Sequence, residues 1–154
     1  MLGRCVARFN AVYDHMTDPA VTCRIRNQMI GYLALASSFE EQARYQRAAP
    51  SINVANEIIN QWQDLVQEDW RSYITEPVFC SEEVTAVERF HAIWDAVAEA
   101  TPQQLPSLDT LWASTQWQLL AAAADEALAI FQVRGFFQDA PDQTRSLLPS
   151  KSSP

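Results

Sequence analysis

The first candidate for chemistry is a glutamate followed three residues later by a histidine, Glu88 and His91. In carboxylate-bridged di-iron bundles, a Glu-x-x-His pair places two metal ligands on one side of a helix, and the site needs a second such pair and further inward carboxylates. His15, the other histidine, has no glutamate three residues before it. Helical periodicity also places Glu88 opposite the apolar side of its helix. We therefore expect no metal and no cofactor, and keep Glu88 and His91 only as the alternative metal site.

Other enzyme signatures are missing from the sequence. It has no Glu-x-x-Glu or Glu-x-x-Asp pair for magnesium, no Gly-x-Ser-x-Gly, no P-loop and no dinucleotide fingerprint. Asp69 projects nearer the apolar side of its helix than its acidic neighbours, so we expect it to be partly buried and paired with an arginine, for which the candidates are Arg24, Arg26 and Arg134. These patterns favour a protein that is not an enzyme. The alternative is a bundle enzyme or a small-ligand protein with a site between helices, built on Asp69, Asn56 or Gln116.

Charge is distributed unevenly along the chain. Residues 1–50 hold 6 basic and 4 acidic side chains, residues 51–100 hold 2 and 10, and residues 101–154 hold 3 and 5, for a net charge of −8. Six of the central acids form two trios spaced i, i+7, i+11, namely Glu57, Asp64 and Glu68, and Glu88, Asp95 and Glu99. On a helix such positions fall within about 20° of one line, opposite the apolar side. They form either a docking face for a basic protein or an ordinary solvated surface.

Tryptophans and arginines refine the expected partner. Trp62, Trp94 and Trp112 follow the apolar pattern and are expected in the core, whereas Trp70 and Trp117 lie near its edges. These two either pack at the core boundary or remain partly exposed as anchors for a partner. The one basic cluster is Arg4, Arg8, Arg24 and Arg26, which we assign to surface ion pairs. With one lysine in the chain, direct binding to nucleic acid is not expected. The sequence thus predicts a protein-binding domain, such as an inhibitor, immunity-type or adaptor protein, that engages a basic protein or associates with itself.

An antiparallel helical bundle would position these side chains. Three glycines in 154 residues are too few for a many-stranded protein, and apolar residues recur every three to four positions. We expect one short helix and four long ones, over about residues 4–16, 19–47, 52–74, 82–100 and 107–134, with Gly135 stopping the last. Residues 1–137 form a single domain in this prediction, and 138–154 a flexible tail.

The cysteines and the apolar runs indicate the compartment. Cys5, Cys23 and Cys80 are odd in number and widely spaced, as is typical of reduced thiols in a cytoplasmic protein. Arginines interrupt the start of the chain before a secretory signal would be complete. No apolar run approaches the roughly 20 residues that cross a bilayer, so we expect no contact with a membrane.

Overall fold

The computed structural model describes residues 18–101 and 103–138. The helices in them are α2 (Pro19–Ala36), α3 (Phe39–Ala48), α4 (Val54–Leu65), the 3₁₀ turn η1 (Trp70–Ser72), α5 (Ser81–Ala100), α6 (Leu108–Trp112) and α7 (Thr115–Gln132). The predicted all-α class is therefore confirmed for this part of the chain. The helix expected over residues 4–16, with Cys5, Arg4 and Arg8, and the tail from residue 139 lie outside the described residues.

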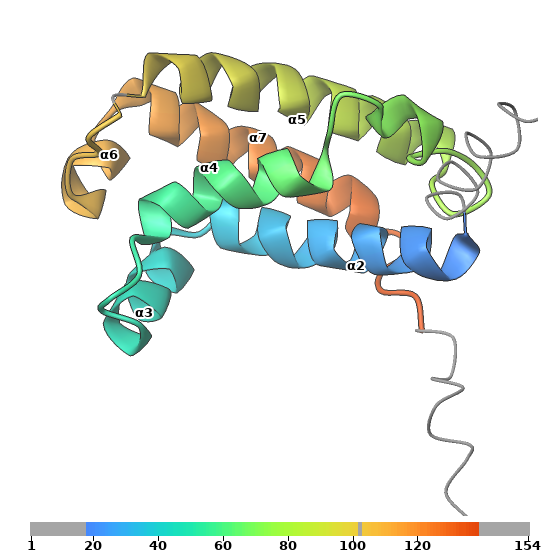
Figure 1. Cartoon of the computed structure of the whole chain (residues 1–154), viewed down its shortest axis with the longest axis horizontal. Helices are drawn as coiled ribbons and strands as arrows, with labels where there is room; N and C mark the ends of the chain where they lie inside the picture. The colour runs from blue at the N-terminus through green and yellow to red at the C-terminus, as the bar shows by residue number, and fades with distance from the viewer. Residues whose placement is uncertain (1–17, 102, 139–154) are drawn as a thin grey trace, which may run out of the picture.

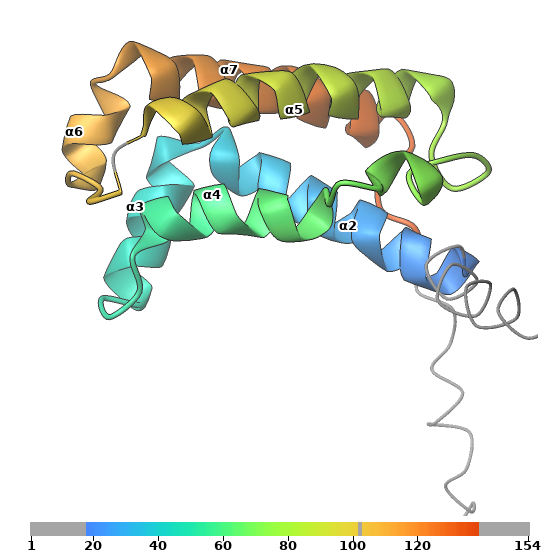
Figure 2. The same ribbon diagram turned by 45° about the horizontal axis from the view of Figure 1, so that its top comes forward.

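Four helices form the body of the molecule: α2, α4, α5 and α7. Each runs antiparallel to the one before it in the chain, so α2 and α5 begin at the same end (Figure 1). They form two layers, α5 with α7 and α2 with α4 (Figure 2). Helix α7 packs along both α5 and α2, and α4 packs along α2. The short helices α3 and α6 lie together at the opposite end of the body, where α2 and α5 finish.

Aromatic side chains fill the centre of the bundle. Trp62 of α4 is fully buried, with its ring 4.6 Å from Phe90 of α5 and 5.3 Å from Tyr32 of α2, measured between centroids. The hydroxyl of Tyr32 donates a hydrogen bond of 2.8 Å to the carbonyl of Ile58, and burial raises the pKa of this tyrosine above its usual range. Aromatic rings bury a large apolar area per residue. Because this cluster takes its rings from α2, α4 and α5, it joins the two layers.

The expected single helix over residues 19–47 is wrong, because the chain breaks at Ser37 and Ser38. The Ser38 hydroxyl accepts a hydrogen bond from the Glu41 N–H and starts α3. The end of α2 is completed by Gln42, which is 1% exposed and donates its side-chain amide to the carbonyls of Leu35 and Ala36. A side chain thus satisfies carbonyls that a continuing helix would have used.

The expected end of the third helix near Ile74 is also wrong. Helix α4 stops at Leu65, and the hydroxyl of Tyr73 donates to the Leu65 carbonyl at 2.8 Å and accepts from the Gln67 N–H at 3.0 Å. Tyr73 therefore fixes a loop where the apolar pattern alone had predicted more helix.

The fifth expected helix is divided in two. Ser114 ends the short α6 and begins α7, since its hydroxyl donates to the Leu111 carbonyl and accepts from the Trp117 N–H. The predicted stop at Gly135 is confirmed, because α7 ends at Gln132 and Gly135 adopts a positive φ of 68°. Within residues 18–101 and 103–138, no helix combines the length and the apolarity needed to span a bilayer.

Candidate functional site

The most deeply buried charges belong to Glu83 and Arg26, whose side chains are both 0% exposed. Glu83 stands in the first turn of α5, two residues after the helix begins at Ser81. Arg26 of α2 reaches it with Nη2 at 2.7 Å from Oε1 and Nε at 3.2 Å from Oε2. Arg134, just after α7, donates to both carboxylate oxygens from its Nε and Nη2 atoms. The N–H of Cys80 adds a bond of 3.2 Å to Oε2.

This network fastens the segment after α7 to α2. Arg26 also donates to the carbonyls of Gly135 and Phe131, and its guanidinium lies 3.9 Å from the centroid of the Phe137 ring. The side chain of Asn27 exchanges two hydrogen bonds with the main chain of Phe137, at 2.7 and 2.9 Å. Because every bond here links elements of the fold, we interpret the network as structural.

The pKa of Glu83 supports that interpretation. Burial alone raises the pKa of its carboxyl, but the hydrogen bonds from Arg26 and Arg134, the charge of Arg26 and the Cys80 N–H together lower it below its ordinary value. In return, Glu83 raises the pKa of the Arg134 guanidinium. A carboxylate held ionised with both oxygens occupied is not placed to donate or accept a proton.

The prediction that Asp69 is partly buried and paired with an arginine is wrong, although two of its predicted partners, Arg26 and Arg134, do pair with a buried carboxylate. Asp69 is exposed, and the buried carboxylate that pairs with Arg26 and Arg134 is Glu83. Assigning Arg26 to surface pairing is likewise wrong, while Arg24 is exposed. Asn56 and Gln116, the other polar residues expected around a site between helices, are also exposed.

The two members of the Glu88 and His91 pair have separate partners. His91 accepts a hydrogen bond of 3.1 Å from the indole N–H of Trp62 at its Nδ1 atom, and its ring stacks on Trp94 at 5.6 Å. Because Nδ1 accepts this hydrogen bond, the neutral ring carries its proton on Nε2. Glu88 instead pairs with Arg71, at 3.3 Å. Among residues 18–101 and 103–138, no three His, Cys, Asp or Glu side chains group as metal ligands; Cys23 and Cys80 are free and half-buried.

Two grooves run beside these residues along α5. The first, the His91 groove, has a volume of about 570 Å³ and is lined by Gln63, Val66, Gln67, Glu68, Trp70, Arg71, His91, Trp94 and Asp95. The second, the Glu88 groove, has a volume of about 620 Å³ and is lined by Arg71, Ile74, Thr75, Glu76, Ser81, Val84, Thr85 and Glu88. Arg71 lines both. Each groove therefore combines apolar walls with two carboxylates, and the same arginine borders both grooves.

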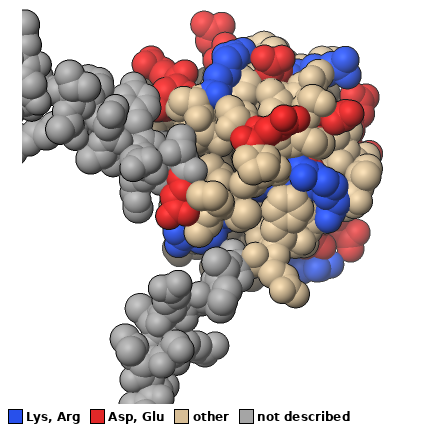
Figure 3. All heavy atoms as spheres, turned by 90° about the vertical axis from the view of Figure 1, so that its right-hand side faces the viewer, with Lys and Arg blue, Asp and Glu red and all other residues tan. Residues whose placement is uncertain are grey.

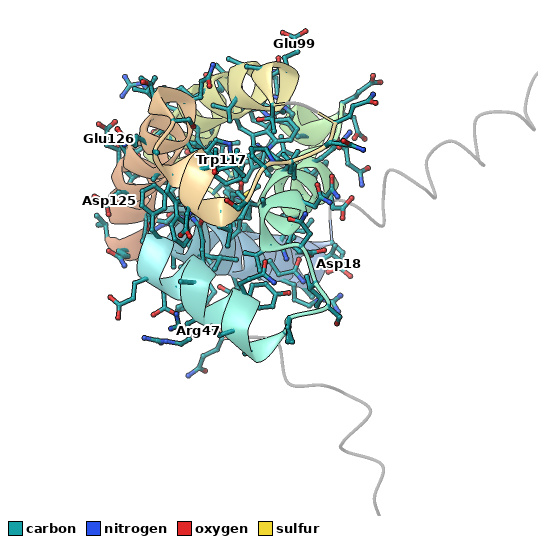
Figure 4. All side chains as sticks on the ribbon, turned by 90° about the vertical axis from the view of Figure 1, so that its left-hand side faces the viewer. Asp18, Arg47, Glu99, Trp117, Asp125 and Glu126 are labelled. Carbon is teal, nitrogen blue, oxygen red and sulfur yellow. The ribbon has the colours of Figure 1, made fainter. Side chains whose placement is uncertain are left out.

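The acidic trios are placed partly as predicted. Glu88, Asp95 and Glu99 share α5 and are exposed, and Figure 4 shows Glu99 pointing outward. The first trio is not one line on a helix, because α4 ends at Leu65 and Glu68 follows in the loop; Asp64 is exposed and Glu57 is half-buried. The loop brings Glu68 into the same groove as Asp95. At the end of the bundle where α2 and α5 begin, acidic and basic side chains are instead interspersed (Figure 3).

Of the two alternatives for Trp70 and Trp117, packing against the core is confirmed and exposure as partner anchors is wrong. They are 3% and 2% exposed, and Figure 4 shows Trp117 inside the ring of helices. Of the three tryptophans expected in the core, Trp62 and Trp94 are buried, and Trp112 is half-buried, stacked on Phe39 and donating its N–H to Gln42. The buried indole N–H groups of Trp94 and Trp117 find no acceptor in the described part of the chain. No tryptophan is thus a ready surface anchor.

The geometry leaves the acidic grooves along α5 as the candidate site. Comparisons of the chain with protein-family models, with curated proteins and with solved structures find no match.

Proposed function

We propose that this protein is a non-enzymatic, cytoplasmic binding domain that engages a basic protein through the acidic surface of α4, its following loop and α5. The observation that carries the proposal is the pair of grooves, which together place Glu68, Asp95, Glu76 and Glu88 beside apolar walls. A partner segment that presents lysine or arginine would meet opposite charge and apolar contact in one place.

The surrounding charge supports the same partner. Of the ten acidic residues in residues 51–100, Glu83 is buried and neutralised by two arginines, while the other nine reach the surface at least in part. They are opposed by Arg71 and Arg89 alone within that range. An excess of negative charge on one surface raises the rate of encounter with basic proteins. It disfavours binding of acidic proteins and of nucleic acid.

The test compares two double charge reversals that change net charge equally. Glu68→Lys with Asp95→Lys alters the His91 groove, whereas Asp125→Lys with Glu126→Lys alters exposed positions on α7 (Figure 4). The probe is a fluorescein-labelled hexa-arginine peptide, titrated by fluorescence anisotropy at low and high salt. We expect salt-sensitive binding that the groove reversal weakens about tenfold or more, since each charge contributes on the order of 1 kcal/mol at short range.

The control reversal separates a site from general attraction. It should weaken binding much less, because Asp125 and Glu126 line neither groove. Equal losses in the two variants would show that only net charge matters and would reject the grooves as the site. No binding by the wild type at low salt would reject the basic partner, and sedimentation analysis of the same sample would then test self-association.

A further inference from the structure

We propose that Arg71 is an internal substitute for the partner's cation: it covers Trp70 and separates the two grooves, and a basic segment must displace it to bind. The inference rests on the proposed function, because it names the residue that such a partner replaces.

The contacts of Arg71 resemble those that a bound arginine would make. Its guanidinium lies 4.3 Å from the centroid of the Trp70 ring, within the range of a cation–π contact. Its Nη2 atom is 3.3 Å from Oε1 of Glu88. Trp70 is only 3% exposed even though it lines the His91 groove beside Arg71. One cationic side chain thus already occupies an aromatic ring and a carboxylate of the proposed site.

The position of Arg71 explains why there are two grooves. It is the one residue that lines both of them, with Glu68 and Asp95 on one side and Glu76 and Glu88 on the other. Rotation of this side chain away from Trp70 would join them into one trough along α5. An extended segment with basic residues would then meet carboxylates on both sides of the face of the Trp70 ring that Arg71 had covered.

Displacement of Arg71 is energetically accessible. Its side chain is 68% exposed and that of Glu88 is 47% exposed, so the pair is weak and screened by salt. By contrast, Arg26 is fully buried and makes hydrogen bonds or cation–π contacts with four residues of the fold, namely Glu83, Gly135, Phe131 and Phe137. Arg71 can therefore move without disturbing the core, whereas movement of Arg26 would break contacts inside the core.

Arg71→Ala tests the inference with the labelled hexa-arginine peptide. Removing the internal competitor should tighten binding about fivefold, equivalent to about 1 kcal/mol at 1.4 kcal/mol per tenfold change. Because the substitution also removes a positive charge, Arg89→Ala is the matched control: Arg89 is an exposed arginine of α5 that lines neither groove. Arg71→Lys retains the charge but stacks less well, and should fall between wild type and Arg71→Ala.

Two further measurements fix the outcome. Circular dichroism should show that Arg71→Ala is as folded as wild type, and the Trp70 indole signal in a nitrogen–proton NMR spectrum should shift on peptide binding. Tighter binding by Arg71→Ala than by Arg89→Ala supports the inference. If Arg71→Ala binds the peptide no more tightly than Arg89→Ala, the inference is overturned, while the proposed binding of a basic partner to the acidic surface still stands. Failure of wild type and both alanine variants to bind at low salt overturns the inference together with the proposed function.

Discussion

Replacing Glu83 by glutamine should destabilise the protein strongly. Glutamine keeps the size of the side chain and one accepting oxygen but loses the negative charge that faces Arg26 and Arg134. Arg26 would remain fully buried with no carboxylate to compensate it. Removing one partner of a buried ion pair costs about 3–5 kcal/mol, because the remaining charge stays desolvated. We expect about 3 kcal/mol for Glu83→Gln, at the lower limit, since some hydrogen bonding persists.

That loss is large in relation to the whole molecule. Domains of this size have free energies of unfolding of about 5–15 kcal/mol, so the variant would lose a fifth or more of its stability. Urea unfolding followed by far-ultraviolet circular dichroism measures the difference. The matched control is Glu41→Gln, because Glu41 pairs with Arg44 at 2.9 Å but both side chains are about half exposed or more. Its cost should stay below about 1 kcal/mol.

The pH dependence gives a second, independent measurement. Because the folded pKa of Glu83 is lowered, its contribution is complete above the unfolded pKa of about 4.3 and is lost as pH falls through the folded value. Wild-type stability should therefore fall more steeply below about pH 4 than that of Glu83→Gln. Glu82, whose pKa is lowered chiefly by a hydrogen bond from its own backbone N–H, is present in both proteins, so its effect cancels. Similar costs for Glu83→Gln and Glu41→Gln, with parallel pH profiles, would show that the Glu83 charge does not stabilise the buried Arg26.

Three further substitutions test the helices by the same urea measurement. Gly31→Ala should stabilise by about 0.5–1 kcal/mol, because an added Cβ meets nothing within 4 Å and alanine favours the helix; a loss of stability would contradict this. Ser38→Ala should cost about 1 kcal/mol by removing the acceptor that starts α3, and no change would mean that α2 and α3 do not depend on this cap. Tyr32→Phe should cost about 1 kcal/mol by removing its bond to the Ile58 carbonyl; a stabilised variant would contradict that role.

The helical class was predictable because apolar periodicity reports which face is buried. The bounds of α5 were predicted almost as observed, since Ser81 and the acids after it start the helix clearly. The breaks at Ser38 and Ser114 were missed because apolar residues continue at helical spacing across them. A signal for the first break was present: Ser38 is followed three residues later by Glu41, a pattern typical of a helix start.

The buried ion network was less predictable. Arg26 lies on the buried face of α2 with Thr22, Met29 and Leu33, so its spacing alone indicated burial. Its partner was not indicated, because Glu83 is distant in the sequence and has the position of an ordinary helix-start carboxylate. Burial of Trp70 also depends on tertiary structure, since it belongs to the hydrophobic core and its ring lies 6.3 Å from that of His91 on α5, measured between centroids. Its own segment is a 3₁₀ turn where periodicity had predicted more α-helix.

Helix α5 links the fixed part of the proposed binding site, the groove walls, to the part that is proposed to move, Arg71. Its first turn is fixed by Glu83 to α2 and to the segment after α7, and its middle is fixed by the hydrogen bond between His91 and Trp62 of α4. The walls of both grooves are therefore pre-organised, and binding need not order them. Arg71 has the same guanidinium as Arg26, but its exposure leaves its contacts weak and exchangeable. Burial thus separates Arg26, which holds the fold together, from Arg71, which we propose that a basic partner replaces.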